Sequence, residues 1–429
     1  MERPRDTRVK SPQKNILIAG CVANVLEWYD FALYGYFASI LARLFFPAQD
    51  ELTSLISTFE VFAAGYLMRP LGAAVFGNLG DKVGRKKVLI VSVILMAAST
   101  TLIGVLPTHA KIGIMAPILL TLLRLVQGFS VGGEFTGTIS FIVEHGQQSR
   151  RGFSGSLATF SLIGGILLGS AMGALITSVL SVEAITSWGW RIPFVFGIVV
   201  GGVGFYLRFG IEETPMFKSL EDKGGVVRTP ILEALTHYWR EIFITMGTTW
   251  AGSATFYIIF IYLTTYLLSE IKIPFSTALH INTISMVILM MASPFMGALS
   301  DRIGRKPVLT IGCLGIAILS YPLFLFLSSG NILYVLGAQA VFAVELAMVF
   351  APLGATLVEL FPTRVRLSAM SLGYNLGFSI FGGTAPLVAT YLIKETGSKV
   401  APSIYLIFSA LVSLLVFLRI RETYNDSLR

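Results

Sequence analysis

The sequence predicts an all-α membrane protein built from twelve transmembrane helices in two pseudo-symmetric six-helix bundles. Its 429 residues are 54% hydrophobic and 13% charged, whereas an average soluble domain is about a quarter charged. The apolar residues gather in runs long enough to cross a bilayer, which takes roughly 20 residues. One short basic turn occurs twice, at residues 77–87 and 297–307, with Gly, Asp, Gly and Arg at the same offsets. A duplicated turn between membrane-length runs indicates two related halves with a site between them.

Twelve apolar runs define the expected helices. They cover residues 15–41, 52–79, 88–106, 115–143, 153–180, 190–210, 241–269, 276–299, 308–328, 331–361, 366–394 and 401–420. The expected organisation is a cytoplasmic segment 1–14, an amino-terminal bundle 15–210, a cytoplasmic linker 211–240, a carboxyl-terminal bundle 241–420 and a cytoplasmic tail 421–429. Within the linker we expect one short surface helix.

The basic residues predict the orientation in the membrane. With the amino terminus inside, 23 of the 32 Lys and Arg residues fall in cytoplasmic segments and six fall outside. Because Lys and Arg concentrate on the cytoplasmic side of membrane proteins, both termini are expected there. The net charge of +8 is therefore a topology signal rather than a sign of nucleic-acid binding. The first run is longer than the apolar core of a cleaved signal, and the absence of targeting segments fits a bacterial inner membrane.

The first run contains acidic residues on a single helical face. Asn24, Glu27, Asp30 and Tyr34 follow one another at spacings of three and four residues, as neighbours on one side of a helix do. Carboxylates near mid-membrane cost about 2.5–3.5 kcal/mol each unless they face a cavity or a partner. Glu27 and Asp30 either handle protons or substrate, or they form an internal ion pair with Arg69. Both interpretations stay open.

A second polar face runs through the fourth apolar run. It contains Arg124, Gln127 and Glu134 at helical spacing. Arg124 cannot titrate usefully, so it is expected to hold a negative charge, either a substrate carboxylate or a protein acid. Glu134 can titrate if it is removed from water. Structural pairing of these residues with the acids of the first run is the alternative.

The duplicated turn is predicted to be a gate. The first copy supplies Gly77, Asp81, Gly84 and Arg85, and the second supplies Gly297, Asp301, Gly304 and Arg305. Glycine permits close approach of helices, aspartate can accept hydrogen bonds from amides at a helix start, and arginine can reach an acid nearby. Glu144 and Glu359 are the candidate acids, because each ends an apolar run in its own half. Such ion pairs are weak when wet and strong when sealed, which suits a contact that forms in one state only.

Other chemistries find no support in the sequence. Two cysteines and four scattered histidines predict neither a disulfide framework nor a metal site. No GxxxxGK[ST] phosphate-binding motif occurs, which argues against a nucleotide partner. We therefore expect no cofactor and no enzymatic activity, and a monomer is the expected functional state.

The second half replaces charge by aromatic and amide side chains. The candidates are Trp250, Tyr257, Tyr374 and Asn375. Aromatic faces attract a quaternary or secondary ammonium, and Arg124 could hold the matching carboxylate. The predicted substrate site adds Asn24, Tyr34 and Gln127 from the first half, so the cavity is charged on one side and aromatic on the other. The alternative is that these aromatic residues only pack or mark the membrane interface.

The doubled turn, together with Arg124-Leu125-Val126-Gln127-Gly128, resembles the major facilitator superfamily. More narrowly, segments 27–31, 69–72, 127–134, 188–194 and 212–215 resemble its metabolite:H+ symporter family, and within it the proline/betaine transporter group. The resemblance covers nearly the whole chain. It is specific for the family but less so for the substrate, because relatives that transport citrate, 2-oxoglutarate or shikimate share these segments.

The resemblance implies the major facilitator fold and alternating access, with a proton entering alongside the substrate. The family's functional residues map onto Glu27, Asp30 and Glu134 for protons, Arg124 in the fourth span, and Asp81, Arg85, Asp301 and Arg305 in the state-locking turns. A small zwitterion such as proline or glycine betaine is the favoured substrate; a carboxylate metabolite, or a non-transporting sensor on the same fold, is the alternative. Two features depart from the family pattern. The nine residues after the last run are too few for the coiled coil of some osmosensing relatives, and Glu60 stands where a small or apolar residue is usual.

Overall fold

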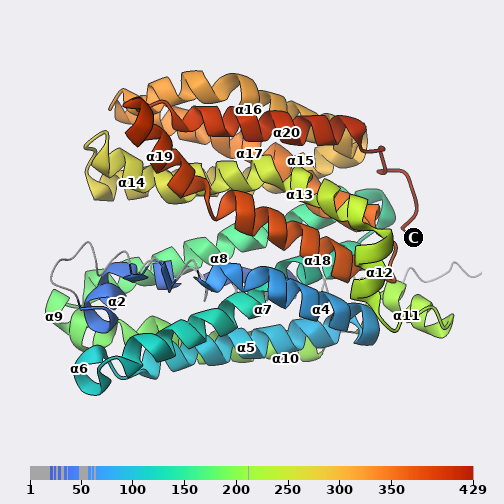
Figure 1. Ribbon diagram of the computed structural model, residues 1–429, viewed down its shortest axis with the longest axis horizontal. Helices are drawn as coiled ribbons and strands as arrows, with labels where there is room; N and C mark the ends of the chain where they lie inside the picture. The colour runs from blue at the N-terminus through green and yellow to red at the C-terminus, as the bar shows by residue number, and fades with distance from the viewer. Residues whose placement is uncertain are drawn as a thin grey trace, which may run out of the picture.

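The computed structural model describes residues 20–22, 24–25, 28–29, 33–35, 37–47, 57–58, 60–61, 64–210 and 212–428. Every regular element in this part of the chain is helical (Figure 1). Ten helical stretches in it are long and apolar enough to cross a membrane, and they correspond to the third to twelfth of the runs predicted above. The first two runs are described only in part: residues 64–79 of the second run are continuous, whereas the first run is interrupted by several gaps.

The amino-terminal half forms one helical layer, the lower one in Figure 1. Its main described helices are α2 (Ala38–Phe45), α4 (Arg69–Val83), α5 (Arg85–Val105), α7 (Met115–His145), α8 (Arg151–Val179) and α10 (Arg191–Phe209). Shorter helices α6 (His109–Ile112) and α9 (Val182–Ala184) lie in the connections. Helix α5 packs against α7 and α10, and α4 packs against α7.

The carboxyl-terminal half forms the upper layer in Figure 1. Its helices are α13 (Trp239–Phe256), α14 (Leu263–Ser269), α15 (Phe275–Ile303), α16 (Arg305–Ser328), α17 (Ile332–Leu360), α18 (Arg366–Gly377), α19 (Ala385–Thr396) and α20 (Pro402–Arg419). Two π-helical segments, Tyr257–Tyr262 and Phe378–Gly382, extend α13 and α18. The layers meet where α8 packs on α15 and α17, and where α4 packs on α18. This arrangement confirms the predicted two-bundle organisation.

The two copies of the basic turn have the same backbone conformation. Gly84 ends α4 with φ 102° and ψ 156°, and Gly304 ends α15 with φ 102° and ψ 159°. Residues with a side chain rarely adopt such a positive φ, so each turn requires glycine at this point. The sequence repeat is therefore a repeat in structure as well. We call the end of the molecule that contains both turns the basic end; it lies at the right of Figure 1.

The linker at the basic end contains two short helices, where the sequence analysis predicted one. They are α11 (Pro215–Asp222) and α12 (Pro230–His237). Each begins with a proline, whose missing N–H costs nothing in the first helical turn, and the hydroxyl of Thr214 accepts a hydrogen bond from the Phe217 N–H. The exposed Lys218 lowers the pKa of Glu212 through a 2.5 Å hydrogen bond and its charge. Exposed pairs of this kind add little stability.

Glycines allow α7 to touch α4, and the residues just before α4, backbone to backbone. A Cβ atom at Gly72 would contact the Phe129 carbonyl oxygen, and one at Gly128 would contact the Gly65 carbonyl oxygen. Overpacking a tight contact typically costs about 1–3 kcal/mol. We expect Gly72→Ala to lower the free energy of unfolding by about 2 kcal/mol or more. Thermal unfolding of the purified protein in detergent tests this. The matched control is Gly202→Ala, because a Cβ atom there meets nothing within 4 Å; equal unfolding temperatures for the two variants would contradict the prediction.

Candidate functional site

The bundles are joined at the basic end by two equivalent sets of hydrogen bonds. The Asp81 carboxylate accepts from the N–H groups of Leu367 (3.1 Å) and Ser368 (2.7 Å), in the first turn of α18. In the other half, the Asp301 carboxylate accepts from the N–H groups of Gly152 and Phe153, both at 2.8 Å, in the first turn of α8. A helix start has unpaired N–H groups and a partial positive charge, so it binds a carboxylate well. Each predicted turn thus holds a helix of the opposite bundle.

Close backbone contact accompanies these bonds. A Cβ atom at Gly77 would lie 2.7 Å from the Ser368 Cα atom, and one at Gly297 would lie 2.5 Å from the Gly152 carbonyl oxygen. No side chain fits at either position without separating the bundles.

Buried ion pairs surround both contacts. Arg85 lies 3.2 Å from Asp81 and 3.6 Å from Glu144, and Arg366 of the opposite bundle lies 2.8 Å from Glu144, with all these side chains 0% exposed. In the second set, Arg305 lies 2.7 Å from Asp301 and 3.2 Å from Glu359. Arg151 of the opposite bundle also lies 3.2 Å from Glu359. The structure therefore brings together every residue predicted for the gate, and in this conformation the basic end is closed.

Two further glutamates were not predicted for this region. The Glu213 carboxylate accepts from the Lys86 N–H at the start of α5 (3.0 Å). The Glu422 carboxylate accepts from the N–H groups of Arg305 (3.0 Å) and Lys306 (2.9 Å) at the start of α16. The signal was present in the sequence, because a Glu-Thr pair follows the last apolar run of each half.

A cavity of about 400 Å³ lies between the bundles, within the roughly 300–1,000 Å³ of small-molecule sites. The amino-terminal half lines it with residues that include Trp28, Tyr66, Arg69 and Phe135; the carboxyl-terminal half supplies, among others, Phe256, Tyr257, Phe260, Phe350, Tyr374 and Phe378. Both halves therefore contribute to one site, as the internal repeat predicted.

Arg69 is the charged residue among those that the structure describes around this cavity. Its Nε donates to the Asn375 side-chain oxygen at 3.1 Å, and Asn375 is fixed in turn by donating to the Gly132 carbonyl at 2.6 Å. Its Nη1 is buried and has no hydrogen-bond partner within the described part of the chain. Arg69 begins α4, and Pro70 follows it in the first turn. The guanidinium is thus held from the opposite bundle while one of its donors stays available.

Aromatic rings form a continuous wall around the same space. The Tyr374 ring stacks on Phe378 at 4.3 Å and lies 5.3 Å from Phe135, measured between centroids. Tyr66 and Tyr257 meet edge to face at 5.8 Å. The guanidinium carbon of Arg69 lies 5.3 Å from the centre of the Tyr66 ring. A cation that enters this space would meet several π faces.

The predicted substrate residues divide into two groups. Tyr257 and Tyr374 line the cavity, whereas Asn375 lies behind Arg69. Trp250 stacks on Phe381 with centroids 3.7 Å apart and does not line it. Asn24 donates to the Ala158 carbonyl and the Ser161 hydroxyl of α8, so it joins two helices of one bundle.

Tyr34, Arg124 and Gln127 form a separate cluster inside the amino-terminal bundle. Arg124 donates to the Gln127 side-chain oxygen at 2.7 Å and lies 4.2 Å from the centre of the Tyr34 ring. Gln127 donates to the Thr100 hydroxyl at 2.7 Å. None of the three lines the central cavity, whereas the sequence analysis had placed them in the substrate site. The sequence analysis had considered Arg69 as an ion-pair partner of Glu27 and Asp30 and had not included it in the predicted zwitterion site.

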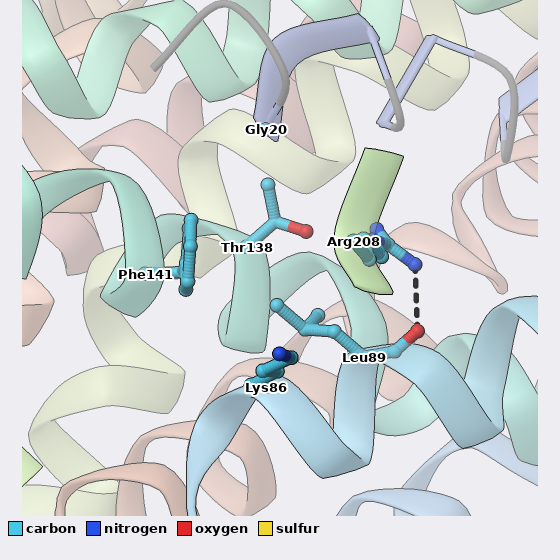
Figure 2. A pocket seen from close by; sticks show the side chains of 6 residues that line it. All are labelled: Gly20, Lys86, Leu89, Thr138, Phe141 and Arg208. Atoms are coloured by element: carbon cyan, nitrogen blue, oxygen red, sulfur yellow. Dashed lines mark hydrogen bonds between the residues drawn. The ribbon is translucent and has the colours of Figure 1, made fainter. Parts of the chain in front are cut away.

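Glu134 points away from the central cavity, although the next residue, Phe135, lines it. Successive residues of a helix differ by about 100° in direction, and Glu134 instead lies 3.7 Å from Arg208 of α10. Arg208 also donates to the Leu89 carbonyl at 2.7 Å, and it lines a second cavity of about 10 Å³ with Lys86 and Thr138 (Figure 2). That volume suits about one water molecule. Glu27 and Asp30 lie outside the described residues, and Glu60 is exposed.

Comparison with known proteins agrees with this architecture. Residues 16–225 match the family described as "Sugar (and other) transporter", and residues 248–429 match "Major Facilitator Superfamily". The glycine betaine/proline/ectoine/pipecolic acid transporter OusA of Dickeya dadantii is 36% identical over 97% of this chain and 85% of its own length. The proline/betaine transporter of Escherichia coli K12 is 34% identical over the same shares, and the ectoine/proline transporter ProP of Corynebacterium glutamicum is 36% identical over 99% and 87%.

Solved structures share the fold. The proton:xylose symporter XylE bound to 6-bromo-6-deoxy-D-glucose has a TM-score of 0.80 and 18% identity, over 96% of this chain and 97% of its own. Two helical bundles that share one central cavity and close at one end define a multi-pass membrane transporter. The chain belongs to the major facilitator superfamily and, within it, to the group of the proline/betaine transporters.

Proposed function

We propose that the chain is a proton-coupled symporter of a small zwitterion of the proline or glycine betaine type. The observation that carries this proposal is the central cavity, where one guanidinium with an available donor faces an aromatic wall. Arginine binds a carboxylate through charge-assisted hydrogen bonds, and aromatic faces attract an ammonium group. A zwitterion carries both groups on one small molecule. The relatives described above are transporters of proline, betaines or ectoine by name, which agrees with this class of substrate.

A carboxylate metabolite remains the second candidate, and the cavity favours it less. A di- or tricarboxylate leaves charges unpaired beside a single arginine, and an unpaired buried charge is costly. A sensor that binds a zwitterion without moving it would have the same cavity, so only a flux measurement separates it from a transporter.

The closed basic end supports alternating access. We assign this end to the cytoplasm, because most Lys and Arg residues lie in segments on that side of the predicted topology. The contacts of Asp81 and Asp301 then close the inner side in this conformation and break when the bundles rock. The proposal includes a bacterial inner membrane, cytoplasmic termini and a functional monomer, with bundles 15–210 and 241–420 joined by linker 211–240.

Proton coupling is assigned to the acids of the amino-terminal bundle. Glu134, with Arg208 at 3.7 Å, is the described acid of this set. The described Arg124 and the acids Glu27 and Asp30, which lie outside the described residues, complete the set in the proposal. A carboxylate held only loosely by its cation can exchange a proton when its surroundings change.

The first experiment measures uptake into proteoliposomes that contain the purified protein. We expect labelled proline or glycine betaine to accumulate under an inward proton gradient and a protonophore to abolish the accumulation. Empty liposomes are the control. Accumulation of citrate or 2-oxoglutarate alone would move the assignment to a carboxylate transporter, and zwitterion binding without flux would favour a sensor.

A further inference from the structure

Glu345 lies in the middle of a membrane-spanning helix. It belongs to α17, which has 29 residues from Ile332 to Leu360. At 1.5 Å per residue, Glu345 stands about 20 Å from either end of this helix. Its carboxyl group is therefore too deep in the membrane to reach the bulk water at either end of the helix.

The carboxyl group of Glu345 is buried without a polar partner. The residue is 5% exposed, and neither Oε1 nor Oε2 has a hydrogen-bond partner within the described chain. The side chain lies against α16, where a Cβ atom at Gly315 would be only 2.9 Å from Oε1. The carboxyl group thus occupies space that is free because residue 315 has no side chain.

The other buried acids in the described chain have charged partners. Glu144 pairs with Arg85 and Arg366, Glu359 pairs with Arg151 and Arg305, and Glu134 has Arg208. No charged group of α16, α17 or any other described element lies within ion-pair distance of Glu345. An isolated carboxylate at this depth is very unfavourable, whereas the protonated acid is tolerated.

We propose that Glu345 is a proton-binding residue of the carboxyl-terminal bundle, protonated in this closed conformation and ionised when α17 moves against α16. This inference rests on the proposed proton symport. It adds a site on the bundle opposite to Glu27, Asp30 and Glu134.

Helix α17 offers a direct connection from this site to the substrate cavity. Phe350, Leu353 and Leu357 of the same helix line the cavity. Pro352 lies between them and lacks the N–H of a regular helical hydrogen bond, so α17 can bend there. An ionised Glu345 needs hydrogen-bond donors that the Gly315 surface does not offer. When the ionised Glu345 side chain moves away from Gly315, α17 shifts, and the part of the cavity wall that α17 forms shifts with it.

Labelling with dicyclohexylcarbodiimide tests whether Glu345 is a neutral acid. The acid transfers its proton to a carbodiimide nitrogen, and its oxygen adds to the central carbon. The adduct rearranges to a stable N-acylurea without loss of any atom. We expect mass spectrometry of the protein, labelled at neutral pH, to locate the reagent on Glu345 and not on the ion-paired Glu359. An unlabelled Glu345 would overturn the proposal.

Transport by Glu345→Gln tests the coupling. The amide mimics the protonated acid, so we expect exchange of labelled for unlabelled zwitterion to stay within about twofold of the wild type, while accumulation driven by a proton gradient is lost. Glu395→Gln, at an exposed position near the carboxyl end of α19, is the matched control. Wild-type accumulation by Glu345→Gln would refute the role.

The labelling separates this inference from the proposed function, because it needs no substrate. If the wild type transports no zwitterion, the proposed function fails and the label still decides whether Glu345 is neutral. If Glu345→Gln does not fold, a labelling experiment on the wild type replaces the transport test. It compares the rate at which the carbodiimide labels Glu345 with and without saturating proline, and we expect the two rates to differ because proline changes the conformation. An identical labelling rate with and without saturating proline would then overturn the proposal.

Discussion

Arg69→Gln is expected to weaken zwitterion uptake more than any other change in the cavity. The glutamine can still contact Asn375, but it loses the positive charge and the available Nη1 donor. Charge-assisted hydrogen bonds contribute about 1.5–3 kcal/mol, and each 1.4 kcal/mol changes an affinity about tenfold. We therefore expect the half-saturating concentration of proline or glycine betaine to rise about 10–100-fold, as measured by initial uptake rates in proteoliposomes.

Choline separates a carboxylate contact from a general loss of structure, because it retains the quaternary ammonium of betaine and lacks the carboxylate. The wild type should prefer betaine to choline as a competitor, and Arg69→Gln should lose most of that preference. Lys111→Gln, at an exposed position outside the cavity, is the control for charge. An unchanged preference in Arg69→Gln would show that another group binds the carboxylate.

The sequence could predict almost all of the residues that join the bundles at the basic end, because they belong to a turn that is repeated at fixed offsets. A tight turn requires glycine at Gly84, and Asp81 and Arg85 lie four residues apart and contact each other. Such local relations are visible along the chain. What could not be predicted is which helix start each aspartate binds. The bonds from Asp81 to Leu367 and Ser368 span almost the whole sequence, and only the packing of one bundle on the other creates them.

The cavity was predicted less well, because helical spacing shows which residues share a face but not which face the partner bundle covers. Arg124 and Gln127 do share a face, and the structure turns that face into the interior of their own bundle. Arg69 and Tyr66 also share a face, three residues apart, and theirs opens toward α18. Identical one-dimensional patterns thus end in different surroundings, and the tertiary contacts decide between them.

Asp81→Asn is expected to have the second large effect, by opening the basic end. The asparagine replaces one of two accepting oxygens by an NH₂ group, which cannot accept from the N–H groups of Leu367 or Ser368. It also removes the charge that Arg85 contacts at 3.2 Å, and breaking a buried ion pair on one side costs about 3–5 kcal/mol. Each 1.4 kcal/mol changes an equilibrium constant tenfold. The ratio of closed to open conformations should therefore fall at least about 100-fold. Uptake should fall at least tenfold.

A single cysteine reports the opening directly. Ser371 of α18 is buried and shares a 2.6 Å hydrogen bond with Thr136 of the opposite bundle, so Ser371→Cys in a background without Cys21 and Cys313 should resist a water-soluble maleimide. Adding Asp81→Asn should make it reactive, because water reaches this interface only when the bundles separate. The control adds Asp222→Asn, on the exposed end of α11, and should leave the cysteine protected. If Asp81→Asn slows uptake while the cysteine stays protected, the aspartate acts on a step other than closure, and the hydrogen bonds to α18 are not what holds this end shut.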